Sequence, residues 1–295
     1  MSEENSRLES EAESETSPTI HYRKDYQVSN FLIDSVSLKF ELFEGYSLVT
    51  SQLDIRSNPE CVENSGELRL DGQGLELLSI AVNEQSLNQS DYQVTDTQLI
   101  ISNCAESFTL TTRVKIKPEE NTSLEGLYKS SGKYCTQCEA EGFRKITYYL
   151  DRPDVMAKFQ VRIEADKQQY PSLLSNGNRI EQGDLDNNRH FATWDDPFKK
   201  PCYLFALCAG DYDLLEDHFV TESGRKVLLQ IFVDKGKLDQ CQHAMESLKR
   251  SMQWDEDVFG LEYDLDIYMI VAVGDFNMGA MENKGLNVFN TKYVL

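Results

Sequence analysis

The chain has 295 residues, and its 50 acidic and 29 basic side chains give a formal net charge of -21 at pH 7. A chain this acidic repels the phosphate backbone of nucleic acids, so we expect no nucleic-acid partner. Hydrophobic residues make up 40% of the sequence, which excludes a wholly disordered chain and is enough for a sizeable core.

The first segment, residues 1–20, is dominated by Glu and Ser and carries almost no apolar residue. Because such a segment cannot bury enough apolar surface to offset the entropy of ordering it, we expect a disordered acidic tail here. The segment also lacks the apolar stretch of a secretory signal, so we expect a cytoplasmic protein with reduced cysteines.

Residues 21–211 are expected to form a β-domain, because apolar and polar side chains alternate along several runs. The clearest runs are residues 36–42, 108–116 and 157–165, each with one apolar and one polar face. Turn-forming pairs such as Asn58-Pro59 and Asn176-Gly177 lie between the runs. Many short strands at such spacing favour a mainly β fold, an antiparallel sandwich or saddle.

Residues 212–295 show a different, mixed pattern. Residues 227–233 are typical of a strand, and apolar residues then recur at a helical period from Leu238 until Gly260, a helix terminator. The nearly continuous apolar run 265–273 predicts a buried strand, and at seven successive apolar residues it is too short for a membrane span. Because the chain ends on another strand-like stretch, residues 288–295, we expect it to stop inside this α+β domain.

The most specific motif follows the buried strand: Gly279-Ala280-Met281-Glu282-Asn283. Two small residues allow a ligand backbone to approach the strand closely, and a glutamate beside such an edge can hold a cation. The pattern therefore predicts an extended peptide lying against a strand edge with its ammonium group near Glu282.

This GAMEN sequence resembles the exopeptidase signature of the aminopeptidase N family of gluzincin zinc metalloaminopeptidases. Residues 277–295, 126–155, 170–178 and 194–213 are also similar to the bacterial form, so the resemblance extends from about residue 21 to 295. It implies an enzyme that releases N-terminal amino acids from peptides with a free N-terminus. It further implies that residues 212–295 begin a thermolysin-like catalytic domain.

The resemblance implies a role for eight residues in substrate binding. Glu282 and Glu139 would bind the free α-amine together, which fixes the N-terminus and rejects substrates without one. Gly279 and Ala280, followed by Met281 and Asn283, would border the peptide backbone. Gln137 and Met278 would line the pocket for the first side chain.

The family's zinc site is expected to lie beyond Leu295. Its H-E-x-x-H sequence places two histidines on one helix face, with a glutamate that acts on the metal-bound water. The only histidines here are His21, His190, His218 and His243, and none fits that spacing. We therefore expect no metal ligand and no catalytic residue in this chain. The general base and the tyrosine that stabilises the oxyanion would also follow Leu295.

A second cysteine-based site is not expected at Cys135-x-x-Cys138. A zinc site would need two further ligands that the sequence does not offer. The following Glu139 and Glu141 would oppose the thiolate that redox chemistry needs. We interpret both cysteines as free thiols in a loop.

The sequence leaves two functions open. The first is the substrate-amine half of a zinc aminopeptidase, inactive alone and monomeric. The second is a truncated, non-catalytic module that binds peptides or another partner. Whether the chain is a fragment, a natural truncation or the product of a decayed gene stays open at this point.

Overall fold

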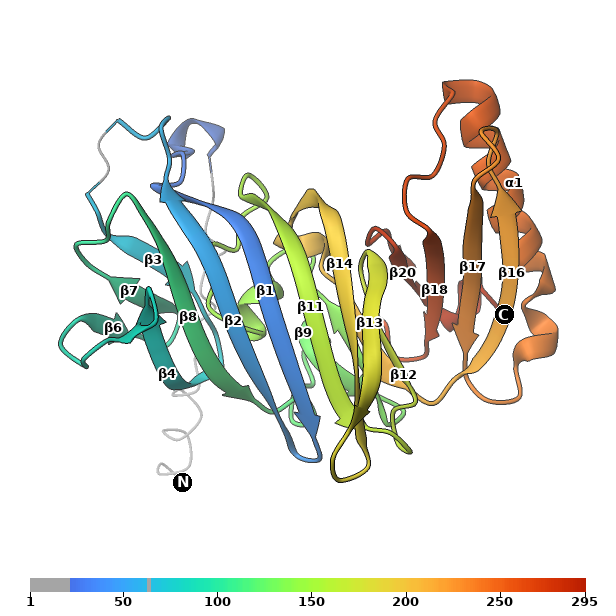
Figure 1. Cartoon of the computed structure of the whole chain (residues 1–295), viewed down its shortest axis with the longest axis horizontal. Coiled ribbons are helices and arrows are strands. Elements are labelled where there is room, and N and C mark those ends of the chain that lie inside the picture. Colours follow the sequence, from blue (N-terminus) through green and yellow to red (C-terminus); the bar gives the residue numbers. More distant parts are fainter. Residues whose placement is uncertain (1–21, 63–64) are drawn as a thin grey trace, which may run out of the picture.

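The computed structural model describes residues 22–62 and 65–295. The predicted acidic tail, residues 1–20, lies outside the described residues. The largest sheet has eight strands in the order β13-β14-β11-β1-β2-β8-β4-β5 and forms the left and middle of Figure 1. Its strands are β1 (Phe31–Phe43), β2 (Tyr46–Ser57), β4 (Glu76–Val82), β5 (Gln85–Ser86), β8 (Ser107–Ile116), β11 (Met156–Asp166), β13 (Asn178–Leu185) and β14 (Arg189–Pro201).

The three alternating runs predicted as strands are confirmed as β1, β8 and β11. Along β1 the side chains of Val36, Leu38 and Phe40 are buried, while the intervening residues are exposed or partly exposed. One face of the sheet therefore covers a core and the other faces water. The neighbouring strands pair antiparallel, as expected, except that β1 pairs parallel with β11.

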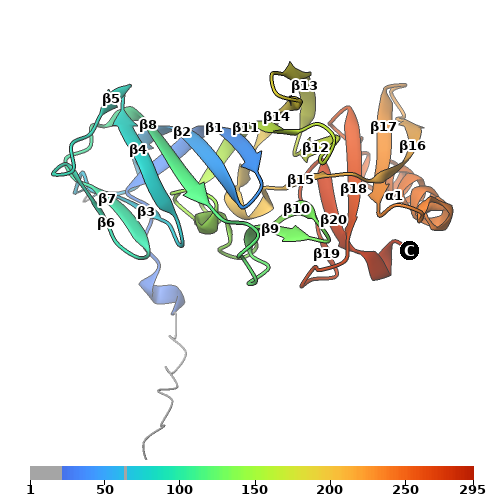
Figure 2. The ribbon, with the colours of Figure 1, turned by 90° about the horizontal axis from the view of Figure 1, so that it is seen from below.

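Two smaller sheets cover the apolar face of the large one (Figure 2). Aromatic rings fill the layer between the large sheet and the smaller ones. They include Phe143, Phe159 and Phe205, whose ring centroids lie 5.3–6.1 Å apart. This layered packing is the predicted β-sandwich. The two sheets are formed by β12 (Ser172–Ser175), β15 (Leu207–Gly210), β10 (Lys133–Gln137) and β9 (Gly126–Ser130), and by β3 (Leu68–Asp71), β7 (Gln98–Ile101) and β6 (Tyr92–Val94).

The C-terminal part of the chain forms a separate five-stranded sheet in the order β16-β17-β18-β20-β19, with helix α1 along one face (Figure 1). The predicted strands at 227–233 and 265–273 are confirmed as β17 and β18. In β18, Ile270 and Ala272 pack with the helix, whereas Met269 and Val271 belong to the core shared with the β-domain. The elements are β16 (Asp213–Val220), β17 (Lys226–Val233), α1 (Gln242–Phe259), β18 (Ile267–Val273), β19 (Ala280–Met281) and β20 (Leu286–Asn290).

Short 3-10 turns account for two differences from the predicted elements. The helix begins at Gln242 rather than Leu238, because residues 238–240 form a 3-10 turn before it. The last strand ends at Asn290, where the Asn290 side chain accepts a hydrogen bond from the Lys292 amide and starts another turn. The five turns are η1 (Arg23–Asp25), η2 (Phe143–Lys145), η3 (Cys202–Leu204), η4 (Leu238–Gln240) and η5 (Thr291–Tyr293).

The predicted helix terminator, Gly260, caps α1 in a left-handed conformation with φ of 63°. Its amide donates to the Glu256 carbonyl over 2.9 Å, which closes the last turn. We expect Gly260→Ala to lower the free energy of unfolding by about 1 kcal/mol, the usual cost of a Cβ in this conformation. Nothing else would oppose the methyl group, because no atom lies within 4 Å of its position. Urea denaturation measures this change, and an unchanged midpoint would contradict the role of Gly260.

Candidate functional site

The GAMEN motif lies at the outer edge of the five-stranded sheet. Ala280 and Met281 form β19, which pairs antiparallel with β20. The Gly279 carbonyl accepts a 2.9 Å hydrogen bond from the Asn290 amide, which fixes the start of the strand. Because β19 comes last in the strand order, no strand of the described residues pairs with its second edge. Such an edge can add an extended peptide as a further strand.

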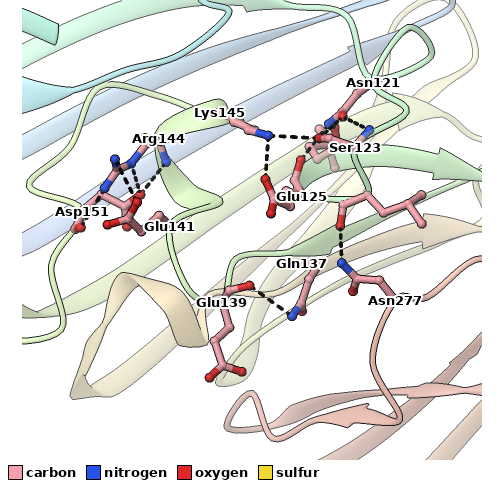
Figure 3. Close-up of polar contacts among 12 residues, drawn as sticks. Asn121, Ser123, Glu125, Gln137, Glu139, Glu141, Arg144, Lys145, Asp151 and Asn277 are labelled. Carbon is pink, nitrogen blue, oxygen red and sulfur yellow. Dashed lines mark hydrogen bonds and ion pairs between the residues drawn. The ribbon is translucent and has the colours of Figure 1, made fainter. Parts of the chain in front are cut away.

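Gln137, at the end of β10, connects the β-domain to this edge. Its side chain is buried, and its amide nitrogen contacts the sulfur of Met278 and lies 3.9 Å from the sulfur of Met281. The same nitrogen lies 3.5 Å from the Glu139 carbonyl oxygen (Figure 3). The structure therefore brings together Gln137, Met278 and Met281, three of the predicted site residues, although 141 positions separate Gln137 from Met278.

The two predicted amine ligands, Glu139 and Glu282, are both exposed. Figure 3 shows the Glu139 carboxylate extending away from the Gln137 amide, and only the Glu139 backbone takes part in a drawn contact. Within residues 22–62 and 65–295, neither carboxylate takes part in a hydrogen bond or an ion pair. Glu141, two positions from Glu139, instead lies 3.2 Å from Arg144. Glu139 and Glu282 are thus the carboxylates of these two segments that remain available to a cationic ligand.

Asn283, the last residue of the motif, points into the protein. It is 1% exposed, and its side-chain oxygen has no hydrogen-bond partner among the described residues. Its backbone carbonyl accepts from the Leu286 amide, which closes the turn into β20. Gly285 lies in this turn with φ of 81°. Asn283 therefore helps to form the turn that follows Glu282.

Sequence reasoning did not select three residues that fasten this region to the β-domain. Tyr128 and Ser130 of β9 bond to Asp275, and Asn176 bonds to the Lys284 carbonyl. Asn176 carried a visible signal as part of Asn176-Gly177, but that pair predicts only a turn. Nothing in the local pattern around Tyr128 or Ser130 indicates a partner about 145 positions away.

The two cysteines of Cys135-x-x-Cys138 are free, but Cys135 lies in a strand and not in a loop as predicted. Cys135 lies within β10 and Cys138 directly after it, and both are about 1% exposed. Burial raises the pKa of Cys135 to about 12 and that of Cys138 well above its ordinary value. Both groups are therefore neutral thiols at physiological pH, which disfavours nucleophilic or redox chemistry.

The predicted site is an open edge rather than a closed pocket. A cleft of about 870 Å³ lies elsewhere, between the loop after β3, the end of β8 and Lys145, and none of the eight predicted site residues lines it. The volume of a cleft does not by itself select a ligand. The unpaired edge of β19 and the free carboxylates of Glu139 and Glu282 therefore define the candidate site.

Comparison with known proteins decides the family. Residues 15–204 match the Peptidase M1 N-terminal domain, and residues 243–295 match the Peptidase family M1 domain. The chain belongs to the M1 peptidase family. It is a homologue of bacterial aminopeptidase N: it is 54% identical to the Escherichia coli protein over 278 residues and 52% identical to that of Caulobacter vibrioides over 271 residues.

These M1 relatives are much longer than this chain. The matches cover 94% and 92% of the chain but 31% of each aminopeptidase N. The crystal structure of Legionella pneumophila aminopeptidase A in complex with aspartic acid superposes with a TM-score of 0.89 at 35% identity. That match covers 92% of this chain and 32% of the other. The chain thus spans about a third of the length of these relatives.

The M1 family is zinc-dependent, but the described residues do not fit a zinc site. No group of three or more His, Cys, Asp or Glu side chains in residues 22–62 and 65–295 is arranged to hold a metal ion. His190, His218 and His243 lie on β14, β16 and α1, and the His190 ring bonds to the Tyr170 carbonyl instead. His21 lies outside the described residues. In the same described part of the chain, no helix is long and apolar enough to cross a membrane.

Proposed function

We propose that this chain carries the amine-binding part of an M1 aminopeptidase active site. Glu139 and Glu282 hold the free α-amine of a peptide, and β19 pairs with the peptide backbone. Gln137 and Met278 border the first side chain. The observation that carries the proposal is that two exposed carboxylates without partners follow β10 and β19, that Gln137 of β10 contacts Met278 just before β19, and that β19 has an unpaired edge.

The chemistry of the two carboxylates suits an ammonium group better than any other part of a peptide. Each can accept charge-assisted hydrogen bonds, and together they place two negative charges beside the single positive charge of the α-amine. An acetylated N-terminus offers neither the charge nor the extra donors. The proposed site therefore selects the end of a peptide, which is the selectivity that an exopeptidase needs.

For the complete M1 enzyme we propose zinc-dependent release of N-terminal amino acids. Zinc would activate the attacking water, while the residues of this chain hold and orient the substrate amine. Because the described residues offer no metal site, we expect the 295-residue chain alone to be inactive. Zinc-dependent turnover of alanyl or leucyl amides by the purified chain would contradict this expectation.

Binding of matched peptides tests the amine site directly. We expect trialanine to bind more tightly than N-acetyl-trialanine, with a preference on the order of tenfold, since each exposed ion pair contributes up to about 1 kcal/mol. Glu139→Gln and Glu282→Gln should each reduce this preference several-fold, and added salt should weaken it. NMR titration of the chain with both peptides measures the two dissociation constants.

Glu141→Gln is the matched control for this experiment, because Glu141 is an exposed carboxylate of the same segment that is paired with Arg144. It should leave the preference unchanged. Equal affinity of the unmodified chain for the two peptides would refute the proposed site. Binding of free-amine peptides is also what the alternative, a non-catalytic peptide-binding module, predicts, and turnover by a longer M1 chain separates the two.

Three further expectations accompany this proposal. The chain divides into a β-domain at 21–211 and the start of a catalytic domain at 212–295, a boundary supported by β16, which opens the five-stranded sheet at Asp213. The protein is monomeric. It acts in the cytoplasm.

A further inference from the structure

The GAMEN segment is fastened to the β-domain on both sides. Before the motif, the bend between β18 and β19 bonds to β9. After the motif, the turn between β19 and β20 bonds to the loop between β12 and β13. Figure 2 shows β9 and β10 beside β19 and β20, although these elements are far apart in the sequence. We call these contacts the front clasp and the back clasp.

The front clasp consists of three hydrogen bonds between β9 and Asp275. The Tyr128 hydroxyl donates to the Asp275 carbonyl oxygen over 2.9 Å. The Ser130 hydroxyl donates to the Asp275 carboxylate over 2.9 Å and lies 3.2 Å from the Asp275 amide nitrogen. Tyr128 is fully buried, and burial raises the pKa of its hydroxyl far above the ordinary value, so this donor stays protonated.

A weaker contact continues the front clasp toward the motif. The Asn277 side-chain nitrogen lies 3.5 Å from the Leu124 carbonyl oxygen, as the dashed line in Figure 3 shows. Met278 follows and contacts Gln137. Successive residues of the bend thus each meet the β-domain, which leaves the backbone before Gly279 little freedom.

The back clasp depends on one buried side chain, Asn176. Its amide nitrogen donates to the Lys284 carbonyl oxygen over 2.9 Å and to the Leu204 carbonyl oxygen over 3.1 Å. Its carbonyl oxygen accepts from the Ala206 amide over 2.7 Å. Since Asn176 is 1% exposed and fully bonded, it fixes the backbone two residues after Glu282 relative to the β-domain.

These contacts explain how two carboxylates on different sheets can serve one ammonium group. Glu139 follows β10 of the β-domain, whereas Glu282 follows β19 of the five-stranded sheet. Neither carboxylate is itself held by a hydrogen bond in the described part of the chain. Their relative position is therefore set by the backbones that carry them, and the clasps join those backbones.

We propose that Tyr128, Ser130, Asp275 and Asn176 are positioning residues that hold Glu282 in register with Glu139. This inference rests on the proposed function, because it assigns the residues to the geometry of that same amine site. They act through the backbone and do not touch the peptide. The amine site is thus formed by residues of two sheets. It can bind an ammonium group only while the clasps hold the two sheets together.

The front clasp can be tested at Asp275, which is exposed, and at its buried partner Ser130. Asp275→Ala and Ser130→Ala should each lower the preference for trialanine over N-acetyl-trialanine about fivefold, the effect of losing about one hydrogen bond. Asp275→Asn keeps an oxygen acceptor and should restore most of the preference. In hydrogen–deuterium exchange, the two alanine variants should also exchange faster than the unmodified chain across residues 276–286.

Asp234→Ala is the matched control. Asp234 follows β17 and bonds to Lys133 of β10 over 2.8 Å, so this contact also joins the two sheets but does not touch the GAMEN segment. The control should leave both the peptide preference and the exchange of residues 276–286 unchanged. It separates positioning of Glu282 from general weakening of the interface.

The outcomes distinguish the inference from the function on which it rests. If Glu139→Gln reduces the preference but the Asp275 and Ser130 variants keep it, the positioning role is wrong and the amine site stands. If the unmodified chain binds trialanine and N-acetyl-trialanine equally well, the amine site is wrong. The hydrogen–deuterium exchange data then test by themselves whether the clasps hold the GAMEN segment. Faster exchange in the variants then supports the fastening, and unchanged exchange overturns it.

Discussion

Replacing Gly177 by alanine is expected to lower the free energy of unfolding by about 2–5 kcal/mol. The residue has φ of 87°, where a side chain costs about 1–2 kcal/mol. A Cβ here would also lie 2.1 Å from the Asp195 carbonyl oxygen and 2.7 Å from the Asp196 Cα. Both are backbone atoms of β14, so relief requires the strand to shift, a further cost of about 1–3 kcal/mol.

Gly224→Ala provides the matched control for Gly177→Ala. Its φ of 88° imposes the same backbone strain, but no atom lies within 4 Å of the added Cβ. Urea denaturation of the two variants should therefore separate strain from crowding, with a loss of about 1–2 kcal/mol for Gly224→Ala. Equal losses of stability in the two variants would show that β14 shifts without an energetic cost. The close approach of Gly177 to β14 would then contribute nothing to the destabilisation.

The Gly177 variant should also disturb the interface beyond its own turn. The backbone of Gly177 lies so close to Gly285 that a Cβ on Gly285 would be 2.9 Å from the Gly177 nitrogen. Asn176, the next residue back, forms the back clasp. A displaced Gly177 should therefore move Lys284 and Glu282 with it.

The second large effect is a loss of stability at alkaline pH. Five of the described cysteines are buried, and in four of them burial raises the pKa of the thiol far above the ordinary 9.0; that of Cys135 rises to about 12. The folded chain keeps these protons where the unfolded chain releases them. Each thiol therefore contributes stability below pH 9 that is lost above it, at about 1.4 kcal/mol per pH unit. The other three thiols are those of Cys138, Cys202 and Cys208.

One buried amine acts in the opposite direction. Lys200 is buried beside Asp196, and desolvation lowers its pKa to about 8 although Asp196 opposes the shift. Between pH 8 and 10.5 the unfolded chain binds this proton and the folded chain does not, so this group adds stability as pH rises. The four thiols outweigh the single amine, and these five groups together give an expected loss of about 4 kcal/mol per pH unit between roughly pH 9.5 and 10.5. Buried tyrosines such as Tyr149 and Tyr212, whose pKa burial also raises, add to this loss above pH 10.

Urea denaturation at pH 9.5, 10 and 10.5, with a reductant to keep the thiols reduced, measures this slope. Cys208→Ala removes one titrating group and should make the slope shallower by about 1.4 kcal/mol per pH unit. Cys61→Ala is the control, because Cys61 is only partly buried. A stability that stays constant from pH 9.5 to 10.5 would contradict the role of the buried thiols.

The strands and the helix could be predicted because their patterns are local. The alternation in residues 36–42 and the helical period that ends at Gly260 each follow from one face of one element meeting a core. The parallel pairing of β1 with β11 could not be predicted in this way. Pairing depends on which strand edges meet across about 120 residues, and an alternating pattern carries no information about its neighbour.

The candidate site was only partly accessible from sequence for the same reason. The GAMEN residues and Glu139 could be selected because a family resemblance marks each segment. The contact of Gln137 with Met278 and Met281 needs the folded interface, as do the clasps formed by Asp275 and Asn176. The burial of Cys135 and Cys138 was missed because charged residues follow them, although their strand faces the core.

The parallel pairing of β1 with β11 also has a consequence during protein synthesis. The chain emerges from the ribosome N-terminus first, so β1, β2 and β8 can join as soon as they are made. The other edge of β1 must wait until residues 156–166 have emerged. Over that interval one edge of β1 stays unpaired and its apolar face stays uncovered. This is the kind of surface that holdase chaperones protect from aggregation. For this fold, the first strand synthesised is among the last to be completed.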